Sequence, residues 1–244
     1  MTTVDKNDNR KIALITGANK GIGFEVARQL AQQNIHVLVG SRDLSRGQKA
    51  IEQLRSQNLP VSLIQIDVTN QSSIDAAVAQ VTNEYKRLDI LINNSGVYTK
   101  EPHPSQLKLE TIRDNFEVNF FGAFAVTQAF LPLIKNSSAG RIVNVSSGLG
   151  SFAFHQSQQN CFYHLAYSAS KTSLNMFTYQ LAQELKKTNI KVNCCTPGLT
   201  ATELTGFHGH SVEIGAKSTV FLATLPDDGP TGKYFDENCG EHQW

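Results

Sequence analysis

Tyr167 and Lys171, in the segment "YSASK", place a phenol and an ammonium four positions apart in a stretch of helical period. Residues i and i+4 of a helix share a face, and the small residues 168–170 between them leave room for a bulky ligand. A free phenol has a pKa near 10 and burial raises it, so acid–base chemistry near neutral pH requires a neighbouring cation. At a separation of about 4 Å and an effective dielectric constant of about 20, the attraction between a cation and a phenolate is roughly 4 kcal/mol. Before desolvation is subtracted, this attraction would lower the pKa of the phenol by about three units. The same spacing also occurs in solvated surface pairs, so the surrounding elements must decide between the two interpretations.

Short apolar runs alternate along the chain with longer segments of helical period, which is typical of buried parallel strands and crossover helices. The runs are "KIALIT", "HVLVG", "VSLIQID", "LDILINN", "RIVNVS", "IKVNCCT" and the weaker "GKYF". The helical segments are residues 21–33, 44–57, 72–87, 111–135 and 165–187. The alternation predicts an α/β fold of the Rossmann type: a doubly wound, mostly parallel seven-stranded sheet with helices on both faces. Ligands of such sheets bind beyond the carboxyl ends of the strands, so functional residues should follow strands directly.

The glycine-rich segment "TGANKGIG", residues 16–23, follows the first apolar run and opens a helical segment. Gly17 can make the tight turn, Gly21 lets the backbone approach a pyrophosphate, and Gly23 permits close packing of helix on strand. The helix start supplies N–H donors for phosphate. The alternative is an ordinary glycine-containing turn. The residues of this loop expected to contact a dinucleotide are Gly17, Asn19, Lys20, Gly21, Ile22 and Gly23.

The segment "GSRD" ends the second apolar run, where an NAD site would carry an acidic residue for the ribose. Ser41 and Arg42 stand there instead, and a cation at this place favours the 2′-phosphate of NADP. Lys20, in the glycine loop, can add a second positive charge, while Asp43 is expected to cap the following helix. The alternative is that Arg42 and Lys20 are solvated surface charges.

Two further strand ends carry polar residues with two interpretations each. Asp67, followed by Val68 in "IDVT", either accepts hydrogen bonds from the adenine end of a cofactor or caps a turn. The segment "NNSG", residues 93–96, either lets the cofactor approach the sheet or stabilises its own loop. The residues predicted here for the cofactor site are Asp67, Val68, Asn94, Ser95 and Gly96.

The order of four motifs, "TGANKGIG", "NNSG", "NVSS" and "YSASK", resembles the short-chain dehydrogenase/reductase family. The resemblance runs from about residue 11 to the carboxyl terminus. Within the family, "GANKGIG", "GSRD" and "NFFG" are most similar to the NADPH-dependent carbonyl reductases. This resemblance implies transfer of a hydride from NADPH to an aldehyde or ketone, with NADP⁺ and an alcohol as products.

The resemblance also implies a role for each matching residue. Tyr167 would be the general acid, and Lys171 would lower its pKa and hold the nicotinamide ribose, so both residues are also expected to belong to the cofactor site. Ser147, the second serine of "NVSS", would polarise the carbonyl. Asn119, in "NFEVNFFG", would support a proton relay, or alternatively only bend the helix or bind backbone. The segment expected to close around the cofactor contains Pro197, Gly198 and Thr202.

Two departures from the family pattern concern the active site. Ser95 replaces the usual alanine of "NNAG", a small change that should preserve the backbone approach. Residues 148–166 form an extended loop of 19 residues between Ser147 and Tyr167, which is longer than the common spacing. Its aromatic residues either line the pocket for a bulky carbonyl compound or pack within the loop, and they are Phe152, Phe154, Phe162 and Tyr163. The loop could also reshape a dimer contact, so both a homo-oligomer and a monomer stay open.

Composition limits the other function classes. The 244 residues fit one domain, with residues 1–10 expected to be disordered. Lysine plus arginine (22) nearly balances aspartate plus glutamate (21), which argues against nucleic-acid or membrane partners and favours a small molecule. The histidines and cysteines have no metal-site spacing, so no metal is expected. The polar amino terminus and the lack of a long apolar run predict a soluble, cytoplasmic protein.

Two other functions fit the same motifs. The first is a reductase of a carrier-bound 3-oxoacyl group or another dedicated ketone, for which the short segment 199–212 offers no basic patch. The second is a non-catalytic protein that binds NADP(H) and regulates a partner, since a fold does not guarantee activity.

Overall fold

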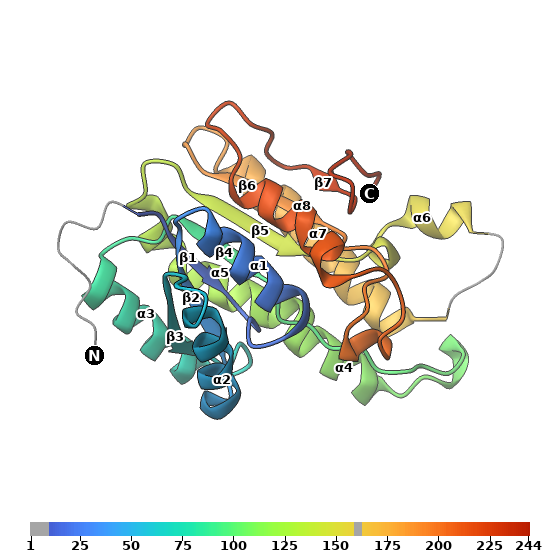
Figure 1. Ribbon diagram of the computed structural model, residues 1–244. Helices are drawn as coiled ribbons and strands as arrows, with labels where there is room; N and C mark the ends of the chain where they lie inside the picture. The colour runs from blue at the N-terminus through green and yellow to red at the C-terminus, as the bar shows by residue number, and fades with distance from the viewer. Residues whose placement is uncertain (1–9, 159–162) are drawn as a thin grey trace.

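Strands and helices alternate along the chain as the apolar runs predict (Figure 1). The computed structural model describes residues 10–158 and 163–244. The strands are β1 (Ile12–Ile15), β2 (His36–Ser41), β3 (Val61–Gln65), β4 (Ile90–Asn93), β5 (Arg141–Val145), β6 (Lys191–Cys195) and β7 (Tyr234–Phe235). The helices are α1 (Gly21–Gln32), α2 (Leu44–Arg55), α3 (Gln71–Tyr85), α4 (Leu109–Phe116), α5 (Ala123–Lys135), α6 (Phe152–Ser157), α7 (Leu165–Glu184) and α8 (Val212–Ala223). The helices α6 and α8 lie outside the helical segments expected from the sequence.

The seven strands form one sheet in the order β3-β2-β1-β4-β5-β6-β7, and every neighbouring pair is parallel. The predicted doubly wound parallel sheet is therefore confirmed. The strand order reverses direction between β1 and β4, because the chain first builds outward to β3 and then returns to the centre. A crevice forms at such a switch point beyond the carboxyl ends of the strands, which is where a ligand is expected.

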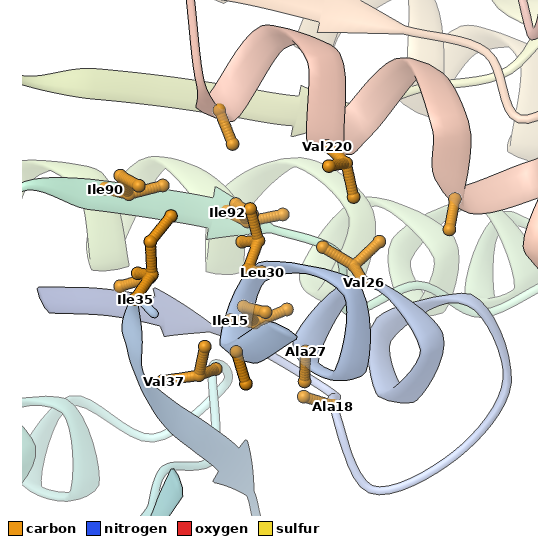
Figure 2. Close-up of a cluster of buried hydrophobic side chains, with 14 of the residues drawn as sticks. Ile15, Ala18, Val26, Ala27, Leu30, Ile35, Val37, Ile90, Ile92 and Val220 are labelled. Atoms are coloured by element: carbon orange, nitrogen blue, oxygen red, sulfur yellow. The ribbon is translucent and has the colours of Figure 1, made fainter. Parts of the chain in front are cut away.

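Two apolar clusters pack the helices onto the sheet, one on each face. The first joins β1, β2 and β4 to α1, α2 and α8, and Figure 2 shows Val26 and Leu30 of α1 close to Ile92 of β4 and Val220 of α8. The second cluster joins the opposite face of the sheet to α3, α5 and α7. The helix that carries Tyr167 and Lys171 is thereby fixed to the sheet over its carboxyl-terminal half by Leu181 and other apolar side chains.

Local sequence explains where two helices begin. Asp43 accepts a hydrogen bond from the Arg46 backbone N–H at 3.0 Å and caps α2, as predicted. Asn70 accepts one from the Ser73 N–H at 2.9 Å and caps α3. Asp67 accepts from the Thr69 N–H at 3.0 Å and from the Thr69 hydroxyl at 2.8 Å, so it caps a turn, which was one of its two interpretations.

The helical stretch Leu109–Lys135 continues from α4 through a π-helical turn (Glu117–Gly122) into α5. It is the one helix among residues 10–158 and 163–244 long and apolar enough to cross a membrane, which the expectation of no long apolar run did not foresee. Its packing against α3, β4 and α7 accounts for this composition, because it is a core helix of the domain.

Two predicted segments differ from expectation. Residues 148–166 are not simply an extended loop: they contain a short 3-10 helix (Gly148–Gly150) and α6, and their last two residues already belong to α7. Figure 1 shows α6 at the edge of the molecule. Of residues 1–10, predicted to be disordered, 1–9 lie outside the described residues. Arg10 is bound, because the Arg87 side chain donates to its carbonyl at 3.0 Å.

Candidate active site

The glycine loop between β1 and α1 has the conformation that its sequence predicts. Gly17 and Gly21 have φ values of 64° and 57°, a region that favours glycine. A side chain on Gly23 would come within 2.8 Å of the Gly17 carbonyl, so only glycine lets the first turn of α1 lie this close to the start of the glycine loop. Lys20, at the N-cap position of α1, makes no side-chain cap. The backbone at this helix start can therefore accommodate a pyrophosphate group.

The segment that ends β4 is fastened to this glycine loop. The Asn94 side chain donates to the carbonyls of Thr16 at 2.9 Å and Gly17 at 3.2 Å. The Thr16 hydroxyl in turn accepts from the backbone N–H groups of Asn94 at 3.0 Å and Ser95 at 3.1 Å. Of the two interpretations of "NNSG", the structure shows loop stabilisation for the Asn94 side chain.

The ribose end of the crevice is cationic, but the cations differ from those expected. Lys20 forms an ion pair with Glu203, so its charge is already balanced. Arg42 follows β2 as predicted, and Arg46, in the first turn of α2, lies in the same wall. Arg46 was missed because its distance from the strand end gives no motif, although its i+4 spacing from Arg42 could have indicated it. The Nε atom of Arg46 lies 3.6 Å from the Asp43 carboxylate, with which it forms an exposed ion pair.

The carboxyl ends of the strands border one cavity of about 1560 Å³. Its wall contains nearly every residue predicted for the site: Gly17, Asn19, Lys20, Gly21, Ile22, Gly23, Ser41, Arg42, Asp67, Val68, Asn94, Ser95, Gly96, Ser147, Tyr167, Lys171, Pro197, Gly198 and Thr202. Asn119 is the exception. Residues that are more than 180 positions apart in the sequence, such as Gly17 and Thr202, thus line the same cavity.

Ser147 is held at the end of β5 by its backbone. Its carbonyl accepts from the Tyr234 hydroxyl at 2.7 Å and from the Gly150 N–H at 2.8 Å. Its side-chain oxygen accepts from the Leu149 N–H at 3.2 Å. The neighbouring Ser146 is buried and donates to the Asn175 side chain, so its role is structural.

Tyr167 and Lys171 lie on the buried side of α7, with 8% and 4% of their surfaces exposed, so they are not a solvated surface pair. The Lys171 ammonium lies 5.8 Å from the centre of the Tyr167 ring and donates to the Val145 carbonyl at 2.8 Å. Burial lowers the pKa of Lys171 to about 8. The arrangement brings a phenol, a hydroxyl and an ammonium to one end of the cavity.

The pKa of Tyr167 is shifted in the direction opposite to the expected one. Burial raises it to about 12, and a hydrogen bond with the Ser147 side chain offsets only part of that rise. Lys171 does not reverse the effect, since its ammonium is itself desolvated and bound to Val145. The expected net lowering of the Tyr167 pKa is therefore wrong for this arrangement, and the phenol holds its proton at neutral pH.

Asn119 lies behind the cavity wall, in the π-helical turn. Its amide nitrogen donates to the Val97 carbonyl and to the Ser170 hydroxyl, both at 3.0 Å, and its oxygen accepts from the Val97 N–H at 2.8 Å. A side chain on Gly96 would lie 3.4 Å from this oxygen and 3.6 Å from the Lys171 ammonium. Backbone binding, one of the two interpretations of Asn119, is thus observed, and its part in a proton relay stays a prediction.

The segment Pro197 to Thr205 crosses the cavity beside the glycine loop. Gly198 has a φ of 66°, and its N–H donates to the Thr196 hydroxyl at 3.2 Å. A side chain on Gly21 would lie 3.4 Å from the Thr202 methyl group, so this segment packs closely on the glycine loop. The Lys20–Glu203 ion pair joins the two segments at the surface.

The aromatic residues of segment 148–166 divide between two spaces. Phe154 lies in the wall of the main cavity, as the pocket interpretation requires. Phe152 and Tyr163 line a second, smaller cavity of about 520 Å³ on the other side of α7. Phe162 lies outside the described residues.

Two aromatic residues beside Tyr167 were not predicted. The Tyr98 ring packs edge-on against that of Tyr167, with ring centres 5.4 Å apart. A hydrogen bond of 3.1 Å joins the Tyr98 hydroxyl to Nδ1 of His164. The position of Tyr98, two residues beyond "NNSG", was the signal available in the sequence. No group of three or more histidine, cysteine, aspartate or glutamate residues within 10–158 and 163–244 is placed to hold a metal ion.

A parallel sheet with a glycine loop after β1, and with serine, tyrosine and lysine together beyond β5, is typical of dinucleotide-dependent oxidoreductases. Residues 11–212 match the short chain dehydrogenase family, and the chain belongs to this family of oxidoreductases. Among curated proteins it is similar to salutaridine reductase of Papaver bracteatum, at 30% identity over 95% of this chain and 95% of that protein. It is also similar to carbonyl reductase (NADPH) 1 of Rattus norvegicus, at 31% identity over 95% and 98% of the two chains. The crystal structure of an NADPH-bound carbonyl reductase from chicken fatty liver superposes with a TM-score of 0.83, at 25% identity, over 96% of this chain and 99% of that one.

Proposed function

We propose that the protein is an NADPH-dependent reductase that converts bulky, apolar aldehydes and ketones into alcohols. The observation that carries the proposal is the meeting of Ser147, Tyr167 and Lys171 in the wall of the cavity that also contains the glycine loop and Arg42. The names of the two curated relatives support a reductase. The activity proposed for this chain also depends on the site described above, because similarity to two reductases does not by itself establish an activity.

The protonation state of Tyr167 at neutral pH is the one that reduction requires. With a pKa raised to about 12 by burial, the phenol is protonated at neutral pH and can donate to a carbonyl oxygen. NADPH, when bound, supplies the hydride that the carbonyl carbon accepts. The Ser147 hydroxyl is placed to donate a hydrogen bond to the same oxygen, and the Lys171 ammonium stabilises the phenolate that remains on Tyr167. Solvent must then return one proton to that phenolate.

NADPH is proposed over NADH because of the charge at the ribose end. Arg42 and Arg46 line the cavity there. The position directly after β2 holds Arg42 and not a carboxylate, and the last residue of β2, Ser41, donates to the Asp43 carbonyl at 2.8 Å. Asp43, the next acidic residue, caps α2 instead. A guanidinium binds a phosphate through charge-assisted hydrogen bonds, whereas the 2′-hydroxyl of NADH requires an acceptor.

The substrate end of the cavity is largely apolar. Phe154 approaches from segment 148–166, and Leu199, Leu204 and Phe207 approach from the other side, with exposed fractions of 62%, 41% and 70% for the last three. Large apolar side chains that stay this exposed beside a cavity are suited to bind an apolar ligand. Asp236 and Glu237 in the wall of the same cavity repel an acidic carrier protein, which argues against the carrier-bound 3-oxoacyl alternative.

The proposal is tested by following NADPH consumption with a panel of aldehydes, aromatic ketones, diketones, quinones and keto esters. The account predicts turnover of apolar carbonyl compounds and at least a tenfold higher kcat/KM with NADPH than with NADH. Equal efficiency with the two cofactors would contradict the assignment of Arg42. A strong preference for carrier-linked 3-oxoacyl groups over free ketones would contradict the substrate class.

A further inference from the structure

The helix that carries Tyr167 lacks an amino-terminal cap from its own sequence. The residue at the N-cap position of α7 is His164, and its side chain makes no capping hydrogen bond. A helix start leaves backbone N–H groups without partners inside the helix, and at a partly buried start they need acceptors from elsewhere. The acceptor for α7 must therefore come from another part of the chain.

Glu101 supplies it. One carboxylate oxygen accepts from the Ala166 N–H at 2.8 Å, and the other accepts from the N–H of Tyr167 itself at 3.0 Å. A carboxylate that binds two N–H groups at a helix start is stabilised by these bonds and by the helix dipole. Glu101 lies 66 residues before Tyr167, in the segment between β4 and α4, so the contact ties two distant elements together.

The same segment contacts Tyr167 a second way. Tyr98, three residues before Glu101, packs edge-on against the Tyr167 ring and is hydrogen-bonded to His164. Burial raises the pKa of Tyr98, and the negative charge of Glu101 adds to that rise. The backbone and the ring of Tyr167 are thus both held by residues 98–101.

From these contacts we infer that Glu101 is a positioning residue, which fixes the start of α7 so that the Tyr167 hydroxyl faces the carbonyl group of the substrate. The inference rests on the proposed function, because the orientation matters only if Tyr167 is the proton donor. A misplacement of about 1 Å can lower a rate about 100-fold when the reacting groups must be aligned.

The geometry separates catalysis from cofactor binding. Lys171 lies one turn beyond Tyr167 and keeps its own hydrogen bond to Val145, and the glycine loop and Arg42 have no contact with Glu101 among the bonds of the described residues. Loss of the Glu101 carboxylate should therefore misplace Tyr167 without changing the site for NADPH. A general loss of folding would weaken both.

The test compares Glu101→Ala, Glu101→Gln and a matched control, Glu110→Ala. Glu110 is also a carboxylate in the first turn of a helix, α4, but it is exposed and lies away from Tyr167 in the contacts observed. Each purified protein is assayed for kcat and KM with the best carbonyl substrate, for the dissociation constant of NADPH, and for amide hydrogen exchange at Ala166 and Tyr167.

The expected result is a 10- to 100-fold lower kcat for Glu101→Ala, with an NADPH dissociation constant within about twofold of wild type. The kcat of Glu101→Gln should lie between those of wild type and Glu101→Ala, because the glutamine amide retains one oxygen that can accept a hydrogen bond from a single N–H. Exchange should quicken at Ala166 and Tyr167 in Glu101→Ala and not in the control. Wild-type kcat in Glu101→Ala, or an equal loss of NADPH affinity, would overturn the inference.

The exchange measurement also separates this inference from the proposed function. If wild-type protein reduces none of the carbonyl compounds, the proposed function fails, while quicker exchange in Glu101→Ala still shows that Glu101 orders the start of α7. Unchanged exchange at Ala166 and Tyr167 in Glu101→Ala would overturn the positioning role whatever the activity.

Discussion

The Lys171 ammonium donates a hydrogen bond to the Val145 carbonyl at 2.8 Å, which joins α7 to the carboxyl end of β5. The ammonium is almost fully buried, and among the described residues no carboxylate is paired with it. A charge placed this way costs folding free energy. A buried ammonium beside Tyr167 therefore lowers stability, and a role in activity would explain why the site contains it.

Replacement of Lys171 by methionine should therefore stabilise the fold at pH 7 and abolish most activity. The pKa shift from 10.5 to about 8 corresponds to about 3 kcal/mol, less about 1 kcal/mol for the lost hydrogen bond, so the free energy of unfolding should rise by about 2 kcal/mol. Turnover should fall at least about 100-fold.

The pH dependence of this gain has a definite sign. Below pH 8 both the folded and the unfolded wild-type chain carry the proton on Lys171, so the penalty is complete. Between about pH 8 and pH 10.5 the unfolded chain binds more protons at this site, so wild-type stability rises with pH relative to the variant. Urea unfolding at pH 7 and pH 10 measures the difference. A methionine variant that is less stable at pH 7, or a gain that grows with pH, would contradict the burial account.

The two cations near the glycine loop should contribute unequally to NADPH binding. Arg42→Ala should raise the NADPH dissociation constant about 10- to 100-fold and leave that of NADH nearly unchanged, because the charge-assisted bonds to the 2′-phosphate are lost. Lys20→Ala should cost less, since the Lys20 ammonium is paired with Glu203. Titration of both cofactors by fluorescence gives the four constants. The reverse order of the two variants, or equal losses for NADPH and NADH, would refute this ranking.

Tyr234 is expected to support Ser147 through the backbone. Its buried hydroxyl donates to the Ser147 carbonyl, so Tyr234→Phe should lower the free energy of unfolding by about 1 kcal/mol and raise the KM for the carbonyl substrate. The loss is modest because the Gly150 N–H still binds the same carbonyl. Tyr179→Phe is the control for stability, because it removes the hydroxyl of a half-exposed tyrosine that packs on the same Trp244 ring as Tyr234 and makes no observed bond to Ser147. Identical unfolding curves and KM values for the two variants would argue against the support.

Features encoded within a few residues could be predicted from the sequence. The strands, most helices, the Asp43 cap and the positive-φ turn at Gly17 each depend on local pattern or on the steric freedom of glycine. The order of the motifs then brought nearly every predicted site residue to the cavity wall, because parallel strands end at one edge of the sheet.

Features that depend on distant partners could not be predicted in the same way. Glu101 reaches Tyr167 across 66 residues, and Lys20 meets Glu203 across 183, and neither pair leaves a local motif. The helix α8 has little amphipathic contrast, because small residues such as Gly215 and Ser218 are buried with its apolar ones. The direction of the Tyr167 pKa shift depended on how deeply the phenol is buried, which the spacing of Tyr167 and Lys171 does not determine.

The central claim is that Tyr167 gives its proton to the substrate carbonyl in a site that binds NADPH independently of that hydroxyl. The most direct test is the Tyr167→Phe variant, with turnover and the NADPH dissociation constant measured on the same preparation. The account predicts a kcat at least about 1000-fold lower, with NADPH affinity within about twofold of wild type. Turnover within tenfold of wild type would contradict it.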